Sequence, residues 1–173
     1  MLRSKWFVAI ILTALISGAG AAAAESVQIS INKMDQKMTV AIDGVQKYVW
    51  LVSTGARGYS TPSGSYTPFR MEPDHYSDEW DDAPMPHSIF FTPAGHAIHG
   101  SPHTKSLGRP VSHGCVRLAP GNAATLYALV QKAGMRNTRV IVSGGFDFGS
   151  AAQIKKPKWL KTSWWSSRHR TTQ

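Results

Sequence analysis

An alternation of apolar and polar residues near the start of the chain places the strongest constraint on its fold. Residues 27–31 read Val-Gln-Ile-Ser-Ile, and the pattern returns in residues 38–42 after a polar stretch. A period of two is typical of strands with one buried face, and the polar stretch is typical of a turn. Asp43-Gly44 is a tight-hairpin signal before a third apolar segment, residues 45–52. We therefore predict that this part of the chain forms an antiparallel meander.

The rest of the domain carries further strand signals and one helix signal. Residues 65–69, 88–92 and 138–143 have the composition of strands. A helix is predicted from Pro120, which suits a first helical position, to Gly134, which can close the last turn. One face of this helix is apolar and is formed by Leu126, Leu129, Val130 and Ala133. The expected fold is mainly β, a sandwich or open barrel with one or two packed helices.

Residues 1–24 have the features of a secretory signal peptide. Two basic residues precede an apolar core at 6–16, and a run of alanines ending at Ala24 offers a cleavage site before Glu25. The alternative is an uncleaved membrane anchor, for which the apolar core is short compared with the ~20 residues that span a bilayer. We expect export and a mature domain over residues 25–145.

Positive charge is concentrated after the domain. The chain has a formal net charge of +9, but residues 155–173 hold six lysines and arginines and no acidic residue, so the domain itself is nearly neutral. We predict a basic, disordered tail over residues 146–173, with Trp159, Trp164 and Trp165 among its cations. Export argues against nucleic acid as its partner. An anionic wall polymer or membrane surface suits this tail better, and a purely solubilising tail is the alternative.

The single cysteine lies in the segment most suited to chemistry. Cys115 follows Ser-His-Gly at a predicted turn and has no internal disulfide partner. A thiol attacks as the thiolate, so it needs a nearby imidazole to accept its proton. His99 ends an apolar run that a neighbouring strand can place across from the thiol, whereas His113 is too close in sequence to aim its ring at the sulfur. We therefore assign His99 as the base. The closely spaced backbone N–H groups of the Gly114-Cys115 step are the predicted oxyanion donors, since Gly114 has no side chain to block their approach.

Two other interpretations of the cysteine are open. Cys115 can be an inert small apolar residue, which is the commoner use of a lone cysteine. It can also be a zinc ligand together with histidines of the same region, although structural zinc sites usually have paired ligands at short fixed spacing. The histidines available for such a site are His96, His99, His103 and His113.

These residues resemble the signature of a known family. The segments 98–100 (Ile-His-Gly) and 112–117 (Ser-His-Gly-Cys-Val-Arg) are similar to the pattern of the L,D-transpeptidase catalytic domain, or YkuD, family. The resemblance implies a β-rich domain with a packed helix, and an enzyme of the bacterial cell wall located in the periplasm or wall. Further segments resemble the family in the same order and extend the resemblance over about residues 27–143: 52–55, 61–66 and 83–86.

The resemblance also implies roles for individual residues. Cys115 would attack the carbonyl that follows the L-centre of diaminopimelate in a peptidoglycan tetrapeptide stem, release D-alanine and form a thioester. An acceptor amine would then resolve the thioester, and no cofactor or metal is implied. The backbone of Gly100 would orient the His99 ring. Ser112 and His113 would line the site, and Arg117 would meet a substrate carboxylate or brace the turn.

The resemblance leaves the acyl acceptor open. A second stem peptide would give a 3→3 cross-link, an outer-membrane protein would give an anchored protein, and water would make the enzyme a cysteine hydrolase of wall peptides. A non-catalytic wall-binding module is a further alternative, and the presence of both His99 and Cys115 speaks against it.

Residues 72–82 differ in kind from the rest of the domain. They hold six of the ten acidic residues, with His75, Tyr76 and Trp80 interleaved, and show no periodicity. One interpretation is a solvated loop. The other is a lid over the cleft, in which aromatic side chains cover a bound peptide. We favour the lid and place Tyr76 among the substrate-binding residues.

Overall fold

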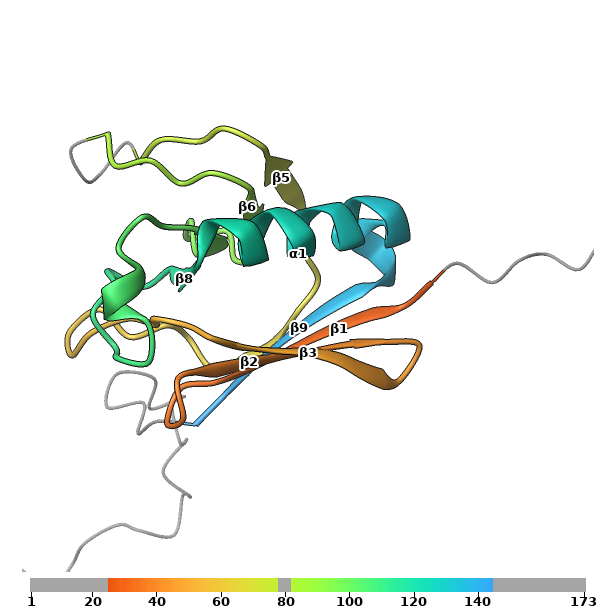
Figure 1. Ribbon diagram of the computed structural model, residues 1–173, viewed down its shortest axis with the longest axis horizontal. Coiled ribbons are helices and arrows are strands. Elements are labelled where there is room, and N and C mark those ends of the chain that lie inside the picture. The colour runs from red at the N-terminus through yellow and green to blue at the C-terminus, as the bar shows by residue number, and fades with distance from the viewer. Residues whose placement is uncertain (1–24, 78–81, 145–173) are drawn as a thin grey trace, which may run out of the picture.

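The computed structural model describes residues 25–77 and 82–144, which fold into two β-sheets and one α-helix (Figure 1). The first sheet has five strands in the order β3-β2-β1-β9-β4. The predicted signal peptide and the predicted tail lie outside the described residues. In chain order, the strands of the first sheet are β1 (Val27–Asn32), β2 (Lys37–Ile42), β3 (Val45–Leu51), β4 (Gly64–Tyr66) and β9 (Thr138–Ser143).

The predicted meander is confirmed in the first sheet. β1, β2 and β3 pair antiparallel, with Ile29 opposite Val40. One irregularity interrupts the β2–β3 ladder, between Val40 and Ala41. β1 also pairs parallel with β9, which puts Ile29 beside Val140. All three aligned side chains are fully buried, so the alternation in the sequence corresponds to one buried face of the central strands.

The second sheet has four short strands in the order β5-β6-β7-β8. β7 and β8 run parallel, and their register puts His99 directly beside Arg117. β5 and β6 pair antiparallel, and so do β6 and β7. The strands are β5 (Arg70–Glu72), β6 (Ser88–Phe90), β7 (Ala97–Gly100) and β8 (Val116–Leu118).

The prediction of one strand over residues 65–69 is wrong. β4 ends at Tyr66 and pairs with β9 in the first sheet, and the chain then passes to β5 in the second sheet. Pro68 lies at this transition, where it has no N–H to donate to a strand ladder. The strand predicted over residues 88–92 is present as β6 but already ends at Phe90.

The predicted helix is confirmed as α1 (Pro120–Ala133). Pro120 is its first residue, and Gly134 follows its end with φ 86°, a left-handed conformation that strains residues with a side chain. The structure also has two 3₁₀ turns, η1 (Thr104–Ser106) and η2 (Met135–Asn137). The inner face of α1 is formed by the buried residues Ala123, Leu126, Val130 and Ala133, with Leu129 partly buried against the core.

One hydrophobic core joins both sheets and the helix. Ile29 and Val140 from the first sheet, Ile98 and Val116 from the second, and Leu126 from α1 are all fully buried in it. In Figure 1, α1 runs across one face of the five-stranded sheet. The short strands of the second sheet are therefore anchored in a core to which the long strands contribute. Within the described ranges, no helix is long and apolar enough to cross a membrane.

Candidate active site

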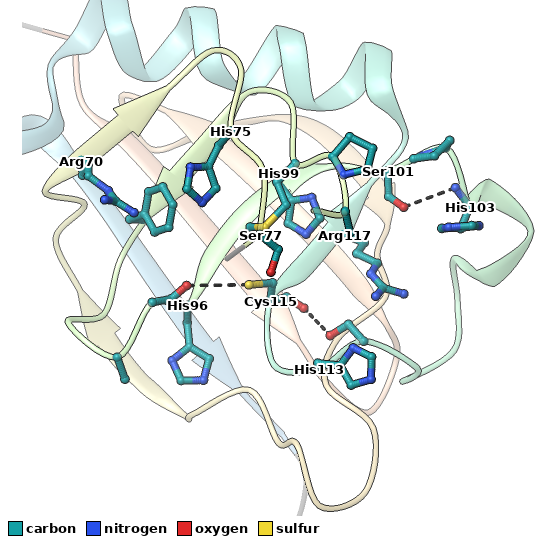
Figure 2. A pocket seen from close by; sticks show the side chains of 18 residues that line it. Arg70, His75, Ser77, His96, His99, Ser101, His103, His113, Cys115 and Arg117 are labelled. Atoms are coloured by element: carbon teal, nitrogen blue, oxygen red, sulfur yellow. Dashed lines mark hydrogen bonds between the residues drawn. The ribbon is translucent and has the colours of Figure 1, made fainter. Parts of the chain in front are cut away.

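A cavity of about 280 Å³ lies at the four-stranded sheet, and each strand of that sheet contributes one side chain to its lining (Figure 2). These side chains are Arg70 from β5, Phe90 from β6, His99 from β7 and Arg117 from β8. Cys115, on the bend immediately before β8, lines the same cavity. The structure therefore brings the predicted nucleophile and the predicted base to one cavity.

The backbone of residues 112–115 forms the turn that presents Cys115. The buried Ser112 hydroxyl donates to the Cys115 carbonyl oxygen and accepts a hydrogen bond from the Gly114 N–H at 3.2 Å. Gly114 has φ 118°, and an added Cβ there would lie 3.1 Å from the His96 ring. Ser112 lines the cavity, as predicted from the resemblance, but its hydroxyl also ties the turn together.

The His99 ring is held in one tautomer. Its Nδ1 lies 2.8 Å from the carbonyl oxygen of Gly100, which only accepts hydrogen bonds, so Nδ1 carries the proton and Nε2 keeps a lone pair. Burial lowers the pKa of His99 to about 4; the Gly100 carbonyl opposes this shift and the charge of Arg117 adds to it. The imidazole is therefore neutral at pH 7 and able to accept a proton. Gly100 itself has little room for a side chain, since an added Cβ would lie 3.1 Å from Pro86 Cγ.

Two more histidines line the cavity on either side of Cys115 (Figure 2). The His113 ring stands edge-on to Tyr59, with ring centroids 4.9 Å apart. On the other side, His96 follows Gly95, whose carbonyl oxygen lies 3.8 Å from Cys115 Sγ. His113 is thus on the cavity wall, where the resemblance places it, and its ring also packs on the loop before β4.

The sequence analysis missed a wall of cationic and aromatic side chains. The Arg70 guanidinium lies 3.7 Å from the centroid of the Phe90 ring, and the His75 ring meets Phe90 edge-on at 5.1 Å. Glu72 contacts both side chains, at 3.5 Å from Arg70 Nε and 2.6 Å from His75 Nδ1. No sequence signal points to this wall, because it depends on the β5–β6 register that sets Arg70 opposite Phe90.

The lining of the cavity is basic. Among the described residues that line it there are two arginines, Arg70 and Arg117, and no aspartate or glutamate. Such a lining favours a ligand that carries carboxylates. Within residues 25–77 and 82–144, no three His, Cys, Asp or Glu side chains are grouped so that they could hold a metal ion.

Tyr76 lies apart from the cavity. It is 58% exposed, it is not among the lining residues, and its backbone bridges to Pro84. Its neighbours His75 and Ser77 line the cavity instead. Residues 78–81, which belong to the predicted lid, lie outside the described residues. The described part of this segment thus contributes His75 and Ser77 to the cavity, and not the predicted Tyr76.

The fold and the cavity agree with a family match over most of the chain. The family model of the L,D-transpeptidase catalytic domain, YkuD, matches residues 26–142. The chain belongs to this family. The match includes every residue that lines the cavity, and it confirms the resemblance drawn from the signature around Cys115.

Solved structures of L,D-transpeptidases have a similar fold. One from Mycobacterium smegmatis has a TM-score of 0.62 and 26% identity, over 69% of this chain and 59% of that chain. One from Mycobacterium tuberculosis H37Rv has a TM-score of 0.62 and 27% identity, over 69% and 58% of the two chains. L,D-transpeptidase 3 from Mycobacterium tuberculosis has a TM-score of 0.62 and 26% identity, over 69% and 61%.

The chain therefore spans about three-fifths of the length of these L,D-transpeptidase structures. No curated protein sequence matches the chain. The predicted fold class, mainly β with a packed helix, is confirmed as that of the L,D-transpeptidases.

Proposed function

We propose that the protein is an L,D-transpeptidase that acts on peptidoglycan tetrapeptide stems through an acyl-enzyme on Cys115. One observation carries the proposal: the pairing of β7 with β8 puts a buried, neutral His99 and the Cys115 thiol on one cavity. Family membership supports the reaction class. A non-catalytic wall-binding module has no need of a neutral imidazole and a thiol on the same cavity.

In the first half-reaction, His99 Nε2 takes the thiol proton while Cys115 Sγ attacks the carbonyl carbon that follows the L-centre of diaminopimelate. The carbonyl π electrons move onto the oxygen, and backbone N–H groups of the turn stabilise the oxyanion. When the oxyanion collapses, the C–N bond breaks, and the leaving nitrogen of D-alanine takes the proton from the His99 imidazolium. The products are a thioester on Cys115 and free D-alanine.

In the second half-reaction, an acceptor amine attacks the thioester carbonyl and gives its proton to His99. The new amide forms as the Cys115 thiolate leaves and takes this proton back. An amine of a second stem gives a 3→3 cross-link, and an amine of an outer-membrane protein gives an anchored protein. Water in place of the amine gives a carboxylic acid, so a wall-peptide hydrolase differs only in what reaches the thioester.

The basic lining supports a substrate with free carboxylates, as stem peptides have. Arg117 lines the cavity beside His99, so we assign it to a substrate carboxylate near the reacting carbonyl. Its backbone N–H and C=O also pair with Ser53, at 2.9 and 3.0 Å, which braces the strand that follows Cys115. Ser112 and His113 contribute to the same wall of the site.

The test is to incubate the protein with purified tetrapeptide muropeptides, with and without an added acceptor amine, and to analyse protein and products by mass spectrometry. We expect an adduct on Cys115 equal to the stem without its D-alanine, and an amide product when the amine is present. Formation of the free acid alone, even with excess amine, would assign the hydrolase. An adduct on another residue, or turnover without one on Cys115, would reject the mechanism.

We further propose that residues 1–24 direct export and that the enzyme works in the periplasm or wall. Family membership supports action at the cell wall. The basic segment 146–173 is proposed to contact an anionic wall polymer or membrane surface. Truncation after Ser150 should then preserve turnover of small soluble stems and reduce retention on sacculi, most strongly at low salt. Unchanged retention would make this segment a spacer.

A further inference from the structure

Thr61 contacts the turn that presents Cys115. It is fully buried and is not among the described residues that line the cavity. Its hydroxyl donates to the Gly114 carbonyl oxygen at 2.7 Å and accepts a hydrogen bond from the Gly55 N–H at 2.9 Å. A hydroxyl has one proton, so this proton is committed to Gly114. The Gly114 carbonyl is thereby held toward the buried Thr61 side chain.

The direction of this carbonyl sets the direction of the next N–H. In a planar trans peptide, the C=O of one residue and the N–H of the following residue point to opposite sides. With the Gly114 oxygen directed at Thr61, the Cys115 N–H points away from Thr61, and Cys115 itself lines the cavity. The Gly114 N–H is instead directed at Ser112 Oγ, at 3.2 Å.

We propose that Thr61 is a positioning residue for acyl transfer: through the Gly114 carbonyl it aims the Cys115 N–H at the oxyanion. The proposal rests on the proposed function and, of the two N–H groups of the Gly114-Cys115 step, gives the role of oxyanion donor to that of Cys115. Donors that are aligned before the reaction stabilise the developing charge without reorganising, so a rotation of this peptide slows acyl transfer. Thr61 needs no contact with substrate to act in this way.

The loop that carries Thr61 is itself held in place. Lys33 Nζ donates to the Thr61 carbonyl oxygen at 2.9 Å, which ties the loop to the turn between β1 and β2. The Gly55 end of the loop is packed so closely that an added Cβ would lie 1.8 Å from the Tyr59 carbonyl oxygen. Both ends are thus fixed, and Thr61→Val removes the hydroxyl with little change in side-chain shape.

The test compares two reactions of the same thiol. Acylation by a carbapenem passes through an oxyanion, whereas alkylation by iodoacetamide displaces iodide at a saturated carbon and forms none. We expect Thr61→Val to slow acylation roughly 10- to 100-fold and to change alkylation by less than about threefold. Thr61→Ser keeps the hydroxyl and should retain the wild-type ratio of the two rates. Intact-protein mass spectrometry measures both rates.

Thr138→Val is the matched control, because Thr138 is also buried and its hydroxyl also donates to a backbone carbonyl, that of Gly134 at 3.0 Å. Thr138 is not among the lining residues, so the Thr138→Val variant should have the same ratio of acylation rate to alkylation rate as the wild type. A parallel fall of both rates in Thr61→Val, or an unchanged acylation rate, would overturn the proposal. If that variant does not fold, Thr61→Ala, in which water can fill the vacated space, is judged by the same ratio. A wild-type protein that is never acylated on Cys115 would reject the proposed function instead.

Discussion

The two sheets contribute differently to the molecule. In the five-stranded sheet, alternate side chains of the strands β1, β2 and β9 fill the core, and none of the sheet's residues is among those described as lining the cavity. The four-stranded sheet has strands of three or four residues, each of which places one side chain in the cavity. The first sheet thus contributes to the core and not to the cavity, whereas the second contributes to both. Substitutions in the two sheets should therefore have separable effects.

Cys115→Ala should give the widest separation between chemistry and stability. The variant loses the nucleophile, while the side chain is only partly buried beside Met85, Phe90 and Ala97. We expect D-alanine release to fall roughly 10⁴-fold or more and the free energy of unfolding to change by less than about 1 kcal/mol. Turnover and denaturant unfolding are measured on the same preparation. Turnover above a few per cent of wild type would show that the sulfur is not the nucleophile.

His99→Ala should have the next largest effect, and the effect should depend on pH. Without the imidazole, acylation of Cys115 should slow by roughly 10²- to 10⁴-fold at pH 7, because no neutral base takes the thiol proton. The defect should shrink toward about pH 10, where the thiol ionises unaided. Carbapenem acylation rates from about pH 6 to about pH 10 measure this rescue.

His113→Ala is the comparison that makes the pH rescue informative. The His113 ring packs on Tyr59 at the cavity wall, so its loss should change affinity or stability without a recovery in alkali. If His113→Ala recovers at high pH and His99→Ala does not, the roles of the two histidines are reversed.

The contrast between the sheets also explains which strands the sequence can predict. β1 and β2 have one buried and one more exposed face, so their apolar residues alternate and the pattern is visible. All four residues of β7 are buried, and β5 and β8 have three residues each, too few to show a period. The error at residues 65–69 has the same origin, because a segment of five residues does not reveal that its two ends join different sheets.

The candidate site is predictable only where its residues share a local segment. Cys115 and His99 can be predicted because a thiol nucleophile needs an imidazole, and both residues belong to one sequence signature within residues 98–117. Arg70, His75 and Thr61 reach the site or its turn through strand pairing and loop packing across long stretches of sequence. The sequence analysis singles out the segments that hold Thr61 and His75, but the contacts that give all three residues their roles appear only in the folded structure.

Ile29→Ala tests the other half of the comparison. Ile29 is fully buried between Val40 and Val140 on the neighbouring strands, so the substitution should lower the free energy of unfolding by roughly 2–5 kcal/mol. Acylation per folded molecule should stay within about twofold of wild type. Ile29→Val is the graded control, with an expected loss of about 0.5–1.5 kcal/mol. Denaturant unfolding and active-site titration measure the two quantities. A rate per folded molecule that falls in step with stability would contradict the division between the sheets.

The smallest effect concerns His99, where chemistry and stability meet in one residue. Its pKa is about 4 in the folded protein, against 6.5 for an exposed histidine, because burial disfavours the charged ring. As the pH falls below 6.5, the unfolded chain binds a proton that the folded protein does not, so the free energy of unfolding falls until the pH reaches about 4. Between about pH 7 and about pH 4.5 this loss amounts to about 2–3 kcal/mol.

His99→Gln isolates this contribution, because glutamine is polar and does not titrate. Other acid-sensitive groups remain in the variant, so the difference between its pH dependence and that of the wild type belongs to His99. Urea unfolding of both proteins at each pH measures the difference, and we expect the variant to lose less stability on acidification. Equal losses in the two proteins would mean that the folded protein protonates His99 freely, and the ring would then not be the buried, neutral base on which the proposed proton transfer from Cys115 depends.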